Sequence, residues 1–427
     1  MPTTLPCFYY PTIPVRLFTR SGLLCPLKDA IEMASSPAIS STAKVIAALA
    51  KGFYGDQPSR MALLNQIDKL RFLVEGPMDP ILRQFGTLNL TTALNILTST
   101  GVLQAVPRSG TISAGQLAET TGMDESAITR AMRIICVQGI AEEVAPDVYA
   151  HNAKSLAHVE GNSHHFFGIT LDYITPFQKL PEYFRTHTKE DLRDIRKSPY
   201  AYGHDREGLP YYDVISDDPK RFEAFNGSLA QMDSEMPVLG MFPFGGLQSQ
   251  VEAEPHRPFI VDIGGGVGKV LMSIQQEAPA GFGGRMILQD RPDVLASIDD
   301  DDIPGITKME HDFFRPQPVK GAHVYLLRRI LHDFYEDVSV QIVRNVATAM
   351  APDSRLLIGD FVVPAQTHVG DDAMVYWMDF SMMMLGGREK TAEQFGAILQ
   401  EAGMEMVKVW PSAFGPQAII EARLKRG

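Results

Sequence analysis

The strongest indication of the fold is the segment Phe259-Ile-Val-Asp-Ile-Gly-Gly-Gly-Val-Gly-Lys269. A short apolar run ends in glycines and a helical pattern follows, so the stretch predicts a buried strand, a tight turn and a helix start. The glycines let a ligand approach the main chain, and the helix start offers free N–H groups. A nicotinamide dinucleotide site would need glycine at the sixth position from Gly264, where Lys269 stands. A purely structural turn is the alternative.

Alternating strands and helices continue downstream. Further buried strands are expected at 286–290, 323–327 and 355–360, with helical stretches between them. This alternation predicts a doubly wound, Rossmann-like and mostly parallel sheet with helices on both faces. We expect this sheet to form a catalytic domain over residues 251–427.

The upstream half reads as helical. A helical pattern over 28–75 stops at Gly76-Pro77, and a later helix begins at Asp124 or Glu125. A hairpin is expected around the Pro146-Asp147 turn. Helix, turn, helix and hairpin predict a winged helix, which could bind DNA or support dimerisation. We therefore expect a helical and winged-helix domain at 28–160 and a helical linker and substrate lid at 161–250. Helical core packing is the alternative for the many aromatic residues of this second segment.

Composition limits the function. Among 427 residues, 39 Lys+Arg stand against 51 Asp+Glu, a net charge of −12 that argues against nucleic acid as the main partner. The three cysteines are far apart, which excludes a disulfide framework or a cysteine-ligated zinc site. No apolar run reaches the roughly 18 residues of a membrane helix. These features predict a cytoplasmic protein with no metal and no membrane partner.

The first 27 residues are rich in proline and contain no acid. Such a composition suits a transit peptide only in part, because the prolines oppose the amphipathic helix that this signal needs. We expect a poorly ordered tail at 1–27.

Asp290, Asp312 and Phe313 are residue types that could bind a nucleoside. Asp290 ends its strand where doubly wound folds bind a ribose, although it could also cap the helix before Pro292. Asp312 could accept from the exocyclic amine of adenine while Phe313 covers the ring. An ordinary turn with a buried Phe is the alternative for this pair.

His332 follows the strand at 323–327, where such sheets bind ligands. Its ordinary pKa near 6.5 suits a general base. Asp360 at a strand end and Glu389 before a helix could orient the imidazole and stabilise its cation. A lone histidine is often structural, and Glu389 could be a solvated charge at a helix start.

Five motifs in order give the chain a strong resemblance to a family. They are Val-Asp-Ile-Gly-Gly-Gly-Val-Gly, Gln-Asp-Arg-Pro, Glu-His-Asp-Phe-Phe, Ile-Leu-His-Asp-Phe and Gly-Gly-Arg-Glu-Lys-Thr. Over roughly residues 88–427 the chain resembles the class I small-molecule O-methyltransferases of plant phenolic and fungal polyketide pathways. The resemblance implies S-adenosyl-L-methionine as cofactor, methylation of a phenolic hydroxyl of an aromatic secondary metabolite, and a homodimer formed through the N-terminal domain.

The family pattern also implies site roles. His332 would be the catalytic base, with Asp360 and Glu389 as flanking acids. The residues implied to bind the cofactor are Gly264, Gly266, Gly268, Asp290, Asp312, Phe313 and Arg328.

The chain departs from the family pattern at four positions, which concern the flanking acid, the cofactor and the substrate. Asp360 is shorter than the Glu common there, Arg328 replaces Lys, and Phe334 replaces a Trp of plant members. Met384 stands where plant members have an Asn that touches the phenol. The candidate substrate contacts are Phe225, Met232 and Met384, for which ordinary core packing is the alternative.

Rival functions remain open at this point. They are a winged-helix transcription regulator, a non-methylating enzyme on the same fold, and a nicotinamide dehydrogenase. An intact His332 speaks against the second, and Lys269 against the third.

Overall fold

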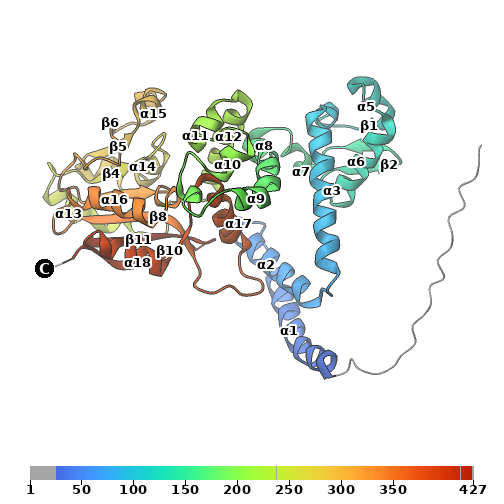
Figure 1. The fold of residues 1–427 in the computed structure, drawn as a ribbon, viewed down its shortest axis with the longest axis horizontal. Helices are drawn as coiled ribbons and strands as arrows, with labels where there is room; N and C mark the ends of the chain where they lie inside the picture. Colours follow the sequence, from blue (N-terminus) through green and yellow to red (C-terminus); the bar gives the residue numbers. More distant parts are fainter. Residues whose placement is uncertain (1–25, 237, 414, 426–427) are drawn as a thin grey trace, which may run out of the picture. The chain divides into compact units, whose positions relative to one another are not determined.

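The computed structural model describes residues 26–236, 238–413 and 415–425 (Figure 1). The tail expected at 1–27 lies outside these residues except for its last two positions. The chain forms two compact units, one up to Gly76 and one from Pro77. In the first unit, helices α1 (Pro26–Lys51) and α2 (Gln57–Val74) confirm the helical pattern. The Asp56 carboxylate starts α2 by accepting from the Ser59 N–H at 2.8 Å.

The second unit begins with small helices and a short antiparallel sheet of strand order β1-β3-β2. Asp124 caps α6 by accepting from the Ala127 N–H at 3.0 Å, so the predicted helix start is confirmed. Leu97, Leu117 and Ile135 pack in the core between these elements. The elements are α3 (Asp79–Ser99), α4 (Val102–Ala105), β1 (Ile112–Ser113), α5 (Ala114–Thr121), α6 (Glu125–Val137), β2 (Glu142–Ala145) and β3 (Val148–Ala150).

A helical segment follows and leads into the main sheet. Helices α8 and α12 pack closely at Gly227. A Cβ at this position would collide with the His165 ring, so the packing requires glycine. The elements are α7 (Ala153–Leu156), α8 (Gly161–Asp172), α9 (Ile174–Thr186), η1 (Asp191–Arg193), α10 (Pro199–Gly203), α11 (Tyr211–Ser216), α12 (Pro219–Glu235), η2 (Phe244–Leu247) and α13 (Gln248–Ala253).

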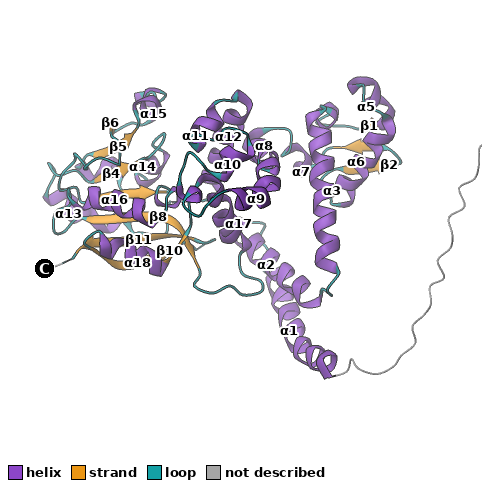
Figure 2. Ribbon diagram, viewed as in Figure 1, coloured by secondary structure: helices purple, strands orange, loops and turns teal. Residues whose placement is uncertain are grey.

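The main sheet has the strand order β10-β11-β8-β7-β4-β5-β6, with β9 paired to β8. Figure 2 shows strands of this sheet in orange among the purple helices. Neighbours from β6 to β8 are parallel, which confirms the predicted doubly wound sheet. The antiparallel pair β10 and β11 was not anticipated. The strands are β4 (Ile260–Ile263), β5 (Met286–Asp290), β6 (Ile306–Glu310), β7 (Val324–Arg328), β8 (Arg355–Val363), β9 (Lys390–Thr391), β10 (Met404–Pro411) and β11 (Gln417–Leu424).

Side chains alternate between two cores, one on each face of the sheet. Val261 packs with the residues of α16 and α18, whereas its neighbour Ile260 packs with α13 and α14. The helices and helical turns are α14 (Lys269–Ile274), η3 (Pro279–Gly283), α15 (Pro292–Ala296), η4 (Asp300–Asp302), η5 (Leu331–Asp333), α16 (Glu336–Ala347), α17 (Ala373–Met382), η6 (Met383–Leu385) and α18 (Ala392–Glu401). The carboxyl ends of β4, β5 and β7 therefore meet at one edge, where the predicted site residues lie.

Candidate active site

The imidazole of His332 lies in η5, just beyond the end of β7. It is only 7% exposed, and its Nδ1 lies 2.9 Å from Oε1 of the buried Glu389. A carboxylate in this place keeps the proton on Nδ1 and leaves Nε2 for proton transfer. The sequence-predicted pair of base and acid is thus brought into direct contact.

Two further carboxylates surround the same ring. Asp333 Oδ1 lies 3.5 Å from His332 Nε2. Asp360 is buried, and both of its oxygens lack a hydrogen-bond partner among the described residues. Burial would lower the pKa of His332, but Glu389, Asp333 and Asp360 outweigh it and raise the pKa to about 9. Burial also raises the pKa of Asp360.

A contact between the helical segment and this site was not predicted. The Tyr212 hydroxyl of α11 donates to Asp333 Oδ2 at 2.9 Å. The two residues are far apart in the chain, and no local pattern in the sequence pointed to the pair. Tyr212 thereby holds the carboxylate that faces Nε2 of His332.

The glycine loop after β4 has the backbone that its sequence predicted. Gly264, Gly266 and Gly268 all have positive φ, which larger residues adopt only with strain. A Cβ at Gly264 would lie 2.6 Å from the Ile330 side chain. The Gly266 N–H donates to Oδ2 of Asp290 at 2.8 Å, so the loop and the end of β5 are joined.

Asp262 lies directly beneath the glycine loop, and no role was predicted for it from the sequence. Its side chain is buried, and neither oxygen has a hydrogen-bond partner among the described residues. It lies under the loop, since a Cβ at Gly265 would be 2.5 Å from its Oδ2. Burial raises the pKa of Asp262 to about 7, against the opposing charge of Arg328. An unsatisfied carboxylate here suits a cationic ligand group. Its signal was an acid in the last two residues of a strand, one residue before the glycines.

The three remaining residues of the predicted cofactor site lie at the same edge. Arg328 ends β7 and donates to the Met236 carbonyl oxygen at 3.0 Å. The half-buried Phe313 lies beside Gly264 and contacts the ring of Phe314. Asp312 is exposed, and its Oδ1 accepts from the Phe314 N–H at 2.9 Å.

The predicted substrate residues lie in two clusters. Met384 is fully buried in the cluster of Tyr200 and Tyr211, and the half-buried Phe225 packs against that cluster. Met232 packs in a separate cluster, with its sulfur 4.0 Å from Arg329 Nη2. Arg329 has φ of 55°, a strained conformation for a residue with a side chain. Arg329 and Met232 therefore join β7 to α12 next to the His332 turn.

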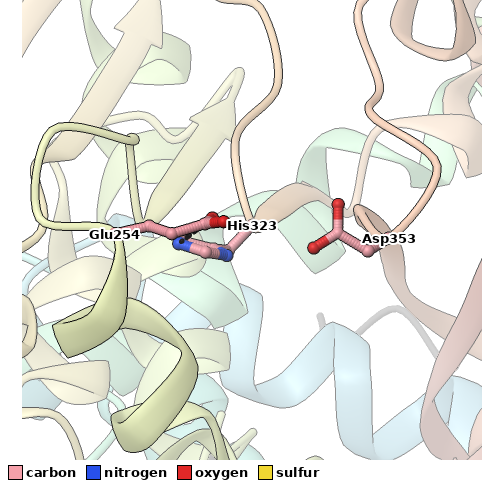
Figure 3. A group of neighbouring side chains, drawn as sticks. All are labelled: Glu254, His323 and Asp353. Carbon is pink, nitrogen blue, oxygen red and sulfur yellow. Dashed lines mark ion pairs between the residues drawn. The ribbon is translucent and has the colours of Figure 1, made fainter.

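A second group of ligand-type side chains lies near the start of β7. Figure 3 shows Glu254 and Asp353 near the buried His323. The three could reach one cation, but the Arg257 guanidinium already donates to Glu254 Oε2 and to both oxygens of Asp353, each at 2.8 Å. The carboxylate charge is thus balanced by an arginine, so we assign no metal to this group.

Comparison with known proteins identifies the family. A family model described as an O-methyltransferase domain matches residues 185–405, slightly more than half of the chain. The chain is also 40% identical over 402 residues to O-methyltransferase hmp5 of Hypomyces subiculosus, covering 92% of this chain and 99% of hmp5. The chain belongs to the O-methyltransferase family.

Other proteins similar to this O-methyltransferase support the same family and fold. O-methyltransferase kntB of Aspergillus niger is 32% identical, over 88% of this chain and 91% of kntB. The crystal structure of OxaC in complex with SAH and oxaline has a TM-score of 0.76 and 26% identity, over 92% of this chain and 100% of OxaC. LepI in complex with SAM has a TM-score of 0.78 at 23% identity, over 91% of this chain and 100% of LepI, which shows the shared fold.

The cofactor of this O-methyltransferase is S-adenosyl-L-methionine, as the resemblance implied. The expected class I methyltransferase fold is likewise confirmed. Across the described residues, none of the helices combines the length and the apolar character needed to span a bilayer.

Proposed function

We propose that this O-methyltransferase methylates a phenolic hydroxyl of an aromatic secondary metabolite, with His332 as general base. The observation that carries the proposal is the buried contact of 2.9 Å between His332 Nδ1 and Glu389 Oε1, which leaves Nε2 to accept a proton. Relatives include OxaC, whose structures hold the small molecules oxaline and meleagrin. An acceptor that is a small molecule is in keeping with these complexes.

The residues around the glycine loop suit the cofactor. The buried Asp262, which has no hydrogen-bond partner within the described part of the chain, could accept from an ammonium group. The Asp290 oxygens keep lone pairs for a ribose beyond their bonds to Gly266 and Arg291. Phe313 beside Gly264 offers a flat apolar face for adenine. When bound, S-adenosyl-L-methionine supplies an electrophilic methyl group on a sulfonium centre.

The protein's part in the reaction is alignment and proton transfer. A phenol has a pKa near 10, so most of it carries its proton at neutral pH. His332 Nε2 would take that proton, while Glu389 holds Nδ1–H and Asp360 stabilises the imidazolium. With a pKa of about 9, His332 itself is mostly protonated at pH 7 in the free enzyme. We therefore expect kcat/KM to rise with pH up to about 9.

The substrate class is tested by incubating the purified enzyme with labelled methyl donor and a panel of aromatic polyketides, with products read by mass. A mass gain of one methyl group on a phenolic member supports the proposal. Methylation confined to non-phenolic oxygens, or no methylation of any member, counts against it. The cofactor assignment has a separate test, because Asp262→Asn should weaken donor affinity in calorimetry by roughly tenfold or more.

We also infer that residues 28–160 serve dimerisation and that 161–250 cover the substrate. The exposed side chains of Ile81, Leu82, Phe85 and Leu88 on α3 form an apolar stripe of the kind that protein interfaces cover. Arg133 of α6 pairs with Asp147 at 3.1 Å, which reduces the positive charge available for DNA. A monomeric mass by light scattering for the parent protein, or an unchanged dimer in Leu82→Glu, would contradict the dimer assignment.

A further inference from the structure

Lys390 is a charged residue buried completely beside the catalytic pair. Its exposed fraction is 0%. The ammonium donates to three main-chain oxygens, those of Leu331 at 2.7 Å, Phe334 at 2.8 Å and Arg388 at 2.9 Å. A lysine has three N–H donors, so all of them are satisfied.

The three acceptors are not scattered over the fold. Leu331 and Phe334 bracket His332 in the turn after β7, and Arg388 immediately precedes Glu389. The ammonium therefore ties the turn that carries the imidazole to the segment that carries its carboxylate. The distance between His332 Nδ1 and Glu389 Oε1 depends on how these two backbone segments are held together.

Neighbouring residues of the same segment show how close this approach is. The Arg388 N–H donates to the His332 carbonyl oxygen at 2.7 Å. A Cβ at Gly387 would lie 2.5 Å from that oxygen, so only glycine fits there. Residues 387–390 thus each contact the turn at 331–334, and Lys390 contributes to this contact a positive charge that is completely buried.

That charge lies among acids. Asp360 from β8, Glu336 from α16, and Glu389 from its own segment act on the Lys390 ammonium, with Arg388 as the nearby cation. Asp360 and Glu389 also act on His332, together with Asp333. Lys390 is therefore the buried cation that offsets carboxylates shared with the imidazole.

We propose that Lys390 is a positioning residue for the acid–base pair, holding the His332 turn on the Glu389 segment and balancing the carboxylates around the imidazole. This rests on the proposed role of His332 as base. Simple space filling would not require an ammonium, because a methionine of similar length would occupy the same volume without the cost of a buried charge. A structural role alone would affect stability without changing the titration of His332.

The test is Lys390→Met in the full-length enzyme, with kcat, both KM values, the pH profile and an ¹⁵N NMR titration of the histidines. We expect kcat to fall about tenfold or more through misplacement of the base. The KM for the donor should stay within about twofold. Removal of a cation near the carboxylates should raise the pKa of His332 by about one unit, moving the acid limb of the pH profile upward.

Two further variants make the outcome decisive. Lys390→Gln keeps two N–H donors but loses the charge. Because it can still bond main-chain oxygens, it should disturb folding less than Lys390→Met, and it should raise the pKa of His332 in the same direction. Lys308→Met is a matched control. Lys308 lies on β6, and its Nζ also donates to a main-chain oxygen, the Ile298 carbonyl, at 2.8 Å. It should leave the His332 titration unchanged.

An unchanged His332 titration and pH profile in Lys390→Gln or Lys390→Met would overturn the proposal and leave Lys390 a structural residue. Failure of the proposed function gives a different result, namely His332→Ala with nearly full turnover. The NMR shift in the Lys390 variants does not depend on turnover, so the two failures are distinguishable.

Discussion

Two buried histidines lie at opposite ends of β7, and each has carboxylates as neighbours. His323 precedes the strand and lies near Glu254 and Asp353, whereas His332 follows it and lies near Glu389, Asp333 and Asp360. Burial and the Arg257 cation lower the pKa of His323, while the acids raise that of His332 to about 9. Nearby acids therefore do not by themselves make a histidine basic.

The position of the balancing cation explains the difference. At His323, burial lowers the pKa of the ring, and a guanidinium bonded directly to both carboxylates opposes their raising effect. At His332, Lys390 bonds main-chain oxygens instead, so Glu389 remains free to bond the imidazole. A histidine that is held and charged by carboxylates suits proton transfer, whereas one with no hydrogen-bond partner among the described residues serves packing.

Removing each of the two imidazole rings should affect turnover very differently. His332→Ala should lower turnover by about 10²–10⁴-fold, the usual contribution of general-base catalysis, with donor binding retained. His323→Ala removes a ring equally buried but remote from the cofactor loop, and turnover per folded enzyme should stay within about twofold of the parent. Single-turnover methyl transfer measures both. Equal losses in the two variants would contradict the assignment of His332 as base.

The next effect concerns the acids. Glu389→Gln should lower the pKa of His332 by at least about one unit, because the opposite charge in contact with the ring is lost. The kcat should fall roughly tenfold or more, since the imidazolium is no longer stabilised. Glu254→Gln is the matched change at the other end of β7 and should alter neither quantity. A pH profile of kcat/KM that is identical in Glu389→Gln and the parent would sink this part of the comparison.

From the sequence, acid–base residues could be predicted at the carboxyl end of β7, but the different surroundings of His323 and His332 could not. His332, Glu389 and Asp290 could be predicted because strand ends and glycine turns leave local patterns in the sequence. No separate role was predicted for Lys390, which belongs to the Gly-Gly-Arg-Glu-Lys-Thr motif. A lysine near a helix start is ordinarily solvated, and nothing in the local sequence predicts its complete burial. The Tyr212 contact with Asp333 depends on how α11 packs on the sheet.

A smaller effect appears in the pH dependence of stability. The pKa of His332 lies above its unfolded value near 6.5, so its contribution is complete below pH 6.5 and is lost as pH rises through about 9. The lowered pKa of His323 has the opposite sign, and stability is lost as pH falls below about 6.5. Melting curves from pH 5.5 to 9.5 should therefore show His332→Asn losing less Tm on the alkaline side and His323→Asn losing less on the acid side, by a few degrees each. The same pH dependence in both variants would contradict the opposite signs.

The smallest effect tests whether Arg257 alone separates the two histidines. In Arg257→Met, Glu254 and Asp353 lose their shared cation, and the pKa of His323 should rise by about one unit in an NMR titration. Arg355 also acts on His323 with the same sign as Arg257, so the rise should stop short of the value at His332. The control is Arg344→Met, whose guanidinium pairs with the exposed Glu401 away from both rings and should leave each titration in place. An unchanged pKa of His323 in Arg257→Met would mean that burial, rather than the neighbouring cation, keeps this ring neutral. The contrast with His332 would then rest on hydrogen bonding to Glu389 and not on the placement of positive charge.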